Sequence, residues 1–438
     1  MKFARLAALV LAVVVFFLIC GCGDTFRPVA TPLPQPAPDP QGFRLAVMGA
    51  CELGAGGLTP CNPSGARSQV GDVNVSGDSV EAVVPVGLSP VFALVQVTPV
   101  VDSATVTTAD FDNDTITQHT DVHGLTAGQF PNVSAPTTVG LPSGAHPISL
   151  GNANGLLYVA EFGRNVVGVI GGFPLALTTE IPVGTNPVNI AVLPSGRKVY
   201  VINRGDGSVT AISTADDSVV ATIAAGSSPV WAVASADSSR VFVVNQGSGT
   251  VSIIDATSDT VIATISVGAS PNYAVFDARN QRVVVTNPGS NTVSVINADP
   301  TSPAFKSVTN VAVGVNPVSV TALTDGTRIY VANSGSHSVS VINSLSLAVS
   351  KTISLVSAVT QADQTPSPVW IASDSASLKI MTANRDSRNA SVILTSTDSE
   401  LTDKTTGNPV RIPAPNVDPT CTGSSCVRLS PVFIAIGG

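Results

Sequence analysis

The chain has 438 residues, of which 44% are hydrophobic and only 11% are charged. This composition is too apolar for a disordered chain, and its high content of Val, Thr, Ser, Ile, Asn and Gly is typical of short strands joined by tight turns. The formal net charge is −8, and no cluster of basic residues occurs. We therefore expect no nucleic-acid partner, because such binding needs basic side chains that neutralise phosphates.

Residues 1–21 have the pattern of a signal peptide. Two basic residues precede an apolar run from Leu6 to Ile19, which is short for a membrane span. The segment from Ile19 to Cys22 resembles the bacterial lipobox, and this resemblance implies cleavage before Cys22 and lipid attachment to it. An ordinary signal peptide or an uncleaved anchor is the alternative. We expect an exported protein of the cell envelope, lipid-anchored to the bacterial membrane and either periplasmic or surface-exposed.

Residues 22–42 begin with Cys22, the expected lipidation site, and continue as a proline-rich segment. Such a segment favours extended polyproline II and cannot build a core, so we interpret it as a spacer between anchor and folded body. A proline-rich ligand motif is the alternative.

Four cysteines remain in the body of the chain: Cys51, Cys61, Cys421 and Cys426. An even number in an oxidising compartment predicts disulfides. Local pairs, Cys51 with Cys61 and Cys421 with Cys426, are the first choice because each closes a short loop. Cross-pairing, which would tie the two ends of the body together, and a metal site at the second pair are the alternatives.

Residues 43–438 are an array of repeats that we expect to form a single all-β domain. The repeats at 187–228 and 229–270 align without a gap. Each repeat contains four β-type segments separated by turns rich in Gly, Asn, Ser and Asp. In the second of these repeats the segments are Val230–Ala234, Val241–Val244, Thr250–Ile254 and Val261–Val267. Four short strands in a repeat of this length are typical of a β-propeller blade.

The second segment of several repeats carries a recognisable motif. Tyr200 to Asn203, Val284 to Asn287 and Tyr330 to Asn333 resemble the YVTN repeat, as do the Thr-Val-Ser-Val-Ile strand and the closing Gly. The resemblance implies a β-propeller of the kind common in archaeal surface-layer proteins and exported bacterial proteins. Asp110 and Glu161 stand where the other repeats have Asn, which departs from the pattern.

The ends of the array predict how the ring closes. A proline begins each repeat, at Pro90, Pro147, Pro187, Pro229, Pro271, Pro317, Pro368 and Pro431. Residues 431–438 supply a first strand with nothing after it, and the missing strands can be Phe43–Met48, Asp72–Ser76 and Val80–Val86. We therefore predict four-stranded blades in a ring of eight, one of them shared between the N- and C-termini, with seven blades as the alternative. Sharing a blade removes a free sheet edge.

Two groups of side chains are candidates for ligand binding. The hairpins after the second strands and the loops before the anchor prolines should share one face, which also collects Arg164, Arg204, Arg385 and Arg388. Aromatic residues recur two positions after the anchor proline, at Phe92, Trp231, Tyr273, Trp370 and Phe433. These rings either wedge between blades or line a central pocket for an apolar or sugar-like ligand. We take the four arginines with Trp231, Tyr273 and Trp370 as the candidate site for an acidic or sugar-like partner.

The recurrent asparagines have a structural interpretation. Asn203, Asn245, Asn287, Asn333 and Asn384 close the second strand of their repeats. Asparagine there can bond to the turn backbone and tolerates positive φ.

We expect no cofactor, with calcium as the alternative. Asp110, Asp112 and Asp114 look like the start of a calcium loop, although Thr115 stands at the sixth position, where such a loop needs Gly. A metal held by His119 and His123 from one loop is a further alternative.

The function that follows is a non-catalytic, envelope-anchored binding or interaction scaffold. The sequence contains no HExxH, GxSxG or P-loop motif and no Ser-His-Asp order. The alternative is an exported propeller enzyme such as a lactonase or a metal-dependent hydrolase. The expected partners are the membrane, through the N-terminal lipid, and an unidentified protein or glycan, and we expect a monomer.

Overall fold

The computed structural model describes residues 45–51, 68–75, 78–98, 103–122, 132–355, 365–374, 376, 378–415 and 430–437. The predicted signal peptide, Cys22 and the tether at 22–42 lie outside the described residues, as do Cys61, Cys421, Cys426 and His123. The predictions that depend on them stay predictions. Within the described ranges, no helix is long and apolar enough to cross a bilayer.

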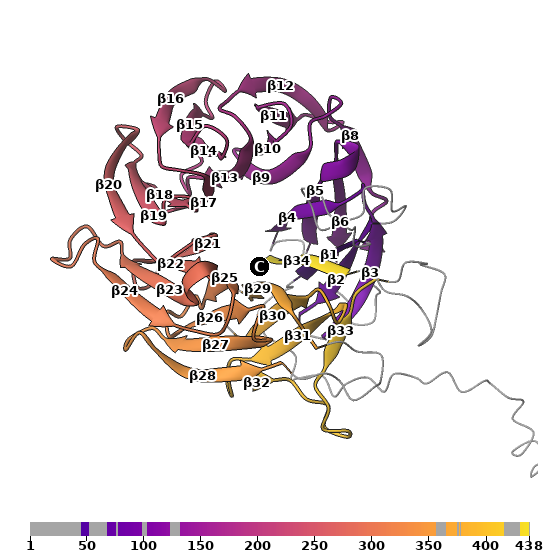
Figure 1. The fold of residues 1–438 in the computed structure, drawn as a ribbon. Coiled ribbons are helices and arrows are strands. Elements are labelled where there is room, and N and C mark those ends of the chain that lie inside the picture. Colours follow the sequence, from indigo (N-terminus) through magenta and orange to yellow (C-terminus); the bar gives the residue numbers. More distant parts are fainter. Residues whose placement is uncertain are drawn as a thin grey trace, which may run out of the picture. The chain divides into compact units, whose positions relative to one another are not determined.

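The described strands form eight antiparallel sheets arranged as blades around a ring (Figure 1). The prediction of an all-β, eight-bladed propeller is confirmed. We number the blades from the first complete repeat. Blade 1 contains β4 (Pro90–Thr98), β5 (Ser103–Asp110), β6 (Thr115–Val122), β7 (Asn132–Val133) and β8 (Thr137–Gly140). Blade 2 contains β9 (Pro147–Ala153), β10 (Leu156–Glu161), β11 (Val166–Gly171) and β12 (Ala176–Pro182). Blade 3 contains β13 (Pro187–Val192), β14 (Lys198–Asn203), β15 (Ser208–Ser213) and β16 (Val219–Ala224).

The remaining blades repeat this plan. Blade 4 contains β17 (Pro229–Ala234), β18 (Arg240–Asn245), β19 (Thr250–Asp255) and β20 (Thr260–Ser266). Blade 5 contains β21 (Tyr273–Asp277), β22 (Arg282–Asn287), β23 (Thr292–Asn297) and β24 (Val308–Ala312). Blade 6 contains β25 (Pro317–Ala322), β26 (Arg328–Asn333), β27 (Ser338–Asn343) and β28 (Ala348–Ser354). Blade 7 contains β29 (Pro368–Ser373), β30 (Lys379–Asn384), β31 (Asn389–Leu394), β32 (Ser399–Glu400) and β33 (Arg411–Pro413). Short 3-10 turns at Phe111–Asn113 and Pro288–Ser290 are the helical segments of the described chain.

Blades 1 and 7 depart from the four-strand plan in their outermost strand. In each, two short strands pair with the third strand in place of one long strand. Both blades form their own sheet, so the seven-bladed alternative is wrong.

Blade 8 is built from both ends of the described chain. Its order is β34 (Ser430–Gly437), β1 (Leu45–Cys51), β2 (Ser68–Asn74) and β3 (Ser79–Pro85), as predicted for a shared blade. β1 continues past the expected Met48 to Cys51, where it pairs with Ser430, and β2 begins at Ser68, before the expected Asp72. The inner strands of neighbouring blades contact one another all round the ring.

The hydrophobic core lies between blades, since successive side chains of a strand point to opposite faces of its sheet. In β14, Val199 and Val201 pack against blade 2, whereas Tyr200 and Ile202 pack against blade 4. The described residues form one such cluster at each of the eight blade interfaces. A blade buries both of its apolar faces only when it has two neighbours, so the ring has to be closed.

Polar contacts also join blades to their neighbours. Lys198, at the start of β14, places Nζ 2.6 Å from a carboxylate oxygen of Asp259 in blade 4, and the Tyr200 hydroxyl donates to the other oxygen at 2.6 Å. Arg328 in blade 6 contacts Asp398 of blade 7 in the same way, at 2.5 Å. These contacts lie at the face of the ring that carries the hairpins between third and fourth strands, which we call the turn face. The opposite face, with the loops before the anchor prolines, is the loop face.

Candidate functional site

A backbone irregularity accompanies the aromatic residues of the inner strands. The pairing of inner and second strands shifts by one residue between Pro229 and Trp231, and again between Pro368 and Trp370. A β-bulge adds one residue to a strand and re-aims the side chain beside it. Both tryptophans line the cavity at the centre of the ring, on the side of the channel nearer the loop face.

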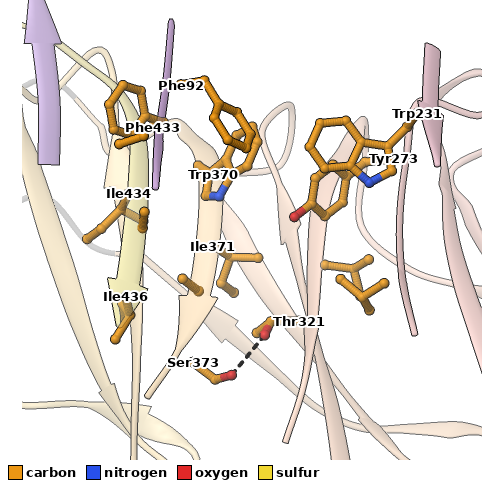
Figure 2. Close-up of a pocket in the computed structure, with 15 residues that line it drawn as sticks. Phe92, Trp231, Tyr273, Thr321, Trp370, Ile371, Ser373, Phe433, Ile434 and Ile436 are labelled. Atoms are coloured by element: carbon orange, nitrogen blue, oxygen red, sulfur yellow. Dashed lines mark hydrogen bonds between the residues drawn. The ribbon is translucent and has the colours of Figure 1, made fainter. Parts of the chain in front are cut away.

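Four of the aromatic rings form one cluster across the channel (Figure 2). The ring centroids of Trp231 and Tyr273 are 4.6 Å apart, and those of Tyr273 and Trp370 are 5.1 Å apart at a near-perpendicular angle. Phe92, from blade 1, lies 6.4 Å from Trp231 of blade 4. Because the rings come from blades 1, 4, 5 and 7, the cluster joins separate sides of the channel.

Phe433 has a different environment from the other four aromatics. Its side chain is 2% exposed and packs between blades 8 and 1 with Leu45, Val47 and Ala93. Its ring lies directly over Gly49, where an added Cβ would be 2.1 Å from a ring carbon. In this blade the aromatic residue mainly acts as a wedge, and only part of it borders the cavity.

Two cavities adjoin the aromatic cluster. The first has a volume of about 260 Å³ and extends from the cluster along the inner strands of blades 6, 7 and 8. Its lining beyond the rings consists mostly of Val275, Val320, Ile371, Ile434 and Ile436, with the hydroxyls of Thr321 and Ser373 farther down the strands. The second, of about 370 Å³, lies beside blades 3, 4 and 5. Of the described side chains, none that carries a charge lines either cavity.

The polar groups of the first cavity fall into two kinds. The Trp231 indole N–H donates to the carbonyl of Ala274 at 3.0 Å, and the hydroxyls of Thr321 and Ser373 bond to each other at 2.9 Å. The Tyr273 hydroxyl and the Trp370 indole N–H have no hydrogen-bond partner within the described part of the chain. Burial raises the pKa of the Tyr273 hydroxyl, so it remains a protonated donor at neutral pH. The cavity thus combines an apolar wall with two donors that can serve a ligand.

The four arginines occupy hairpins of the loop face. The backbone of Arg204 bonds to Asn186 in the loop before an anchor proline, and Arg385 bonds likewise to Ser367. None of the arginines lines the two cavities. A single site that combines them with Trp231, Tyr273 and Trp370 therefore stays a prediction.

The side chains of these arginines differ in what they contact. Arg164 is held by Glu161, at 3.0 Å, and by Glu180, so carboxylates compensate its charge. The Arg204 side chain donates to Gln246 at 3.1 Å, and Arg385 lies 3.5 Å from Asp386. Arg388 is exposed.

The recurrent asparagines bind side chains of the third strand, which corrects the expectation of a bond to the turn backbone. Asn245 is fully buried, and its amide N–H₂ donates to Thr250 at 3.1 Å and Ser252 at 2.9 Å. Asn203, Asn287, Asn333 and Asn384 make the same kind of contact. None of the five has positive φ. Their amide N–H₂ groups are bonded within the blade, which indicates a structural role, since buried donors need partners.

Asp110 and Glu161 occupy the same position in blades 1 and 2, and both are fully buried. Burial raises the pKa of Asp110 to about 6, although hydroxyls such as that of Thr117, at 2.6 Å, oppose the rise. Burial likewise raises the pKa of Glu161 to about 7, against the effect of Arg164. Neither carboxyl is accessible to a ligand from solvent.

The three aspartates of the suggested calcium loop are directed to separate partners. Asp110 binds threonine hydroxyls, Asp112 accepts from the Ser89 hydroxyl, and Asp114 accepts the backbone N–H groups of Gly144 and His146 at 2.7 and 2.8 Å. Among the described residues, no three His, Cys, Asp or Glu side chains gather as metal ligands. The calcium prediction gains no support from these contacts.

His119 does not lie in a loop as expected but within β6, where it is fully enclosed. Its Nε2 lies 2.8 Å from Asp72, and this pair joins blade 1 to blade 8. Cys51 is buried at the end of β1, while its three candidate partners lie outside the described residues, so the disulfide pairing stays a prediction.

The sequence analysis did not predict the polar contacts between blades, nor the Thr321 and Ser373 hydroxyls in the first cavity. The residues that make these contacts each begin a second strand, and this recurrence was the available sequence signal: Lys198, Arg282, Arg328 and Lys379. Thr321 and Ser373 gave no such signal, because serine and threonine occur throughout the repeats.

Comparison with known proteins identifies a fold and no family. No family model matches the sequence, and no curated protein matches it. AztD from Citrobacter koseri matches with a TM-score of 0.58 at 11% identity, over 90% of this chain and 99% of AztD. A chain of hydrazine synthase from Kuenenia stuttgartiensis matches with a TM-score of 0.53 at 17% identity, over 72% of this chain and 98% of that one. A functionally unknown protein from Desulfotomaculum acetoxidans matches with a TM-score of 0.52 at 14% identity, over 71% and 95%. The shared feature is the β-propeller. At these identities the likeness shows the fold alone.

Proposed function

We propose that this protein is an exported, lipid-anchored β-propeller of the YVTN type that binds a ligand in its central channel without turning it over. The motif of the second strands supports the YVTN assignment, and the segment ending at Cys22 supports the anchor. The tether at 22–42 would hold the propeller away from the membrane.

The observation that carries the proposal is the aromatic cluster with its adjoining cavities. Binding sites for small molecules are typically concave and largely apolar, with few polar groups that orient the ligand. The channel meets this description, with Trp231, Tyr273 and Trp370 on its wall and two donors among them that have no partner among the described residues. A ring of eight packed blades also holds these side chains in fixed positions.

The positions of Asp110 and Glu161, the two carboxyl groups discussed above, favour binding without turnover. A general acid or base has to reach the substrate and needs a pKa suited to its task. Asp110 and Glu161 have pKa values of about 6 and 7, but both are 0% exposed, and burial itself causes these values. Their raised pKa values therefore agree with a structural role.

The binding function is tested by titrating the mature protein with a panel of lactones, esters, phosphates and glycosides. The chain has only two tryptophans, Trp231 and Trp370, so a change in intrinsic fluorescence reports on the channel. We expect at least one class to change the emission without being consumed. Turnover that disappears when one channel residue is substituted would establish the alternative, an exported lactonase or metal-dependent hydrolase.

The anchor is tested separately by labelling cells with radioactive palmitate. Label should enter the wild-type protein and be absent from Cys22→Ala. Equal labelling of both proteins would contradict the lipoprotein assignment.

A further inference from the structure

We infer that the channel ligand is an uncharged, mainly aromatic or aliphatic molecule that carries one hydrogen-bond acceptor. The Tyr273 hydroxyl and the Trp370 indole N–H donate hydrogen bonds to this acceptor. This inference rests on the proposed binding function and names the chemistry of the ligand at that site.

The lining of the cavities argues against a charged ligand. Neither cavity has a charged side chain among the described residues that line it. Moving an ionised group from water into such surroundings without a partner is strongly unfavourable. A charged ligand would therefore lose affinity unless it stayed at the rim.

A sugar is also a poor match for this lining. A sugar presents many hydroxyls, and each buried hydroxyl needs a partner. The hydroxyls of Thr321 and Ser373 already bond to each other, and the Trp231 N–H is held by Ala274. That leaves the Tyr273 hydroxyl and the Trp370 N–H, which is too few for a polyol and sufficient for a single carbonyl or ether oxygen.

The two donors are placed to act on one acceptor. Tyr273 and Trp370 are neighbours, with ring centroids 5.1 Å apart, and Figure 2 shows the Tyr273 hydroxyl turned toward Trp370. Both residues line the first cavity, together with Ile371 and Val275. An apolar ligand without an acceptor would leave both donors buried and unpaired, which weakens its binding.

The size of the cavity suits a molecule of one or two rings. An engineered apolar cavity of about 150 Å³ accommodates benzene, and the first cavity has about 260 Å³. Three probes that differ in one feature therefore test the inference: benzophenone carries one carbonyl, diphenylmethane lacks it, and diphenylacetate carries a negative charge.

Equilibrium dialysis of each probe against the mature protein measures binding, and tryptophan emission reports its location. We expect benzophenone to bind at least tenfold more tightly than diphenylacetate. Tyr273→Phe removes only the hydroxyl and should weaken benzophenone about three- to tenfold, while diphenylmethane changes by less than twofold. Irradiation should attach benzophenone to peptides that contain Val275 or Ile371.

Tyr158→Phe is the matched control, because the Tyr158 hydroxyl bonds to Asp217 at the turn face, away from the channel. It should leave the binding of all three probes unchanged. A diphenylacetate affinity equal to that of benzophenone, an equal effect of Tyr273→Phe on both neutral probes, or no binding of either neutral probe would overturn the inference. If a charged or sugar ligand from the panel changes the emission instead, the inference fails and the binding function stands, whereas turnover in the channel overturns the function itself.

Discussion

The Nζ atom of Lys379 lies 2.8 Å from both carboxylate oxygens of Asp78, and this contact joins blade 7 to blade 8, the blade made from both ends of the chain. Lys379 also donates to the carbonyl of Val75 at 2.6 Å. The side chains of Lys379 and Asp78 are only 8% and 2% exposed. Burial raises the pKa of Asp78, and Lys379 opposes that rise, so Lys379 stabilises the charge of the Asp78 carboxylate.

Lys379→Met should therefore destabilise the protein more than the same change at the less buried Lys198 of blade 3. Removing one member of a buried pair leaves an uncompensated charge, which typically costs about 3–5 kcal/mol. Lys198→Met removes the equivalent contact in blade 3, where the lysine is 21% exposed, and should cost clearly less. Denaturant unfolding of both variants measures the difference, and equal losses would contradict this account of the blade 7 contact.

Asp110→Asn should make the stability of the protein less sensitive to pH. An ordinary aspartate in the unfolded chain loses its proton near pH 3.8, whereas burial holds the folded pKa of Asp110 at about 6. Between these values the folded state binds more protons, so its stability falls as the pH rises through this window. Asparagine cannot ionise and is the native residue here in five other blades, so the variant should gain up to about 2–3 kcal/mol over wild type by pH 7.

Urea unfolding at pH 4.5, 5.5 and 7 follows this difference. Asp216→Asn is the control, since Asp216 is exposed and hydrogen bonds from Ser213 and Ser218 lower its pKa. It should show no gain over wild type between pH 5 and 7. A difference between Asp110→Asn and wild type that is the same at every pH would show that Asp110 does not titrate in this window.

Gly49→Ala should destabilise the shared blade, because the new methyl group would overlap the ring of Phe433 at 2.1 Å. Overpacking of this kind typically costs about 1–3 kcal/mol. Combining it with Phe433→Leu should recover part of the loss. Gly140→Ala is the control, since nothing lies within 4 Å of its added Cβ. Additive losses in the double variant, measured by thermal unfolding, would show that the two residues do not compete for space.

Deleting residues 431–438 should lower the melting temperature strongly. The deletion removes β34, whose Phe433 and Ile434 are buried against blades 1 and 7. Apolar burial contributes ~25 cal/mol per Å², so the loss amounts to several kcal/mol of a marginal stability. An unchanged melting temperature would mean that the ring closes without β34.

A circular permutant that keeps β34 and joins it to β1 should retain the closed ring. Gly437 and Leu45 are paired at one end of the β34–β1 ladder, so a short hairpin linker can join them. New termini placed before Pro90 would make blade 8 continuous, like the other blades. We expect its melting temperature to match that of wild type, and failure of the permutant to fold would mean that the chain order itself is required.

The repeat pattern made much of the fold predictable from the sequence. The role of Phe433 and the partners of the asparagines could not be predicted, because they depend on contacts between distant residues. The shared inner-strand position of Trp231 and Trp370 could be predicted because the same position recurs after each anchor proline. The different role of Phe433 depends on Gly49, which lies near the other end of the sequence and belongs to no repeat motif. The partners of the asparagines were missed because the relevant hydroxyls, such as that of Ser252, look like any other strand serine until the register is known.

The joint construction of blade 8 also determines the order in which the molecule can be completed during biosynthesis. Strand β1 is synthesised well before its inner partner β34, because the strands of blades 1 to 7 lie between them in the sequence. Contacts between such distant segments form slowly, because a long loop must close first. For the exported protein proposed here, blade 8 and the closed ring therefore form only after β34 has been made, so an open ring with exposed sheet edges precedes the closed one.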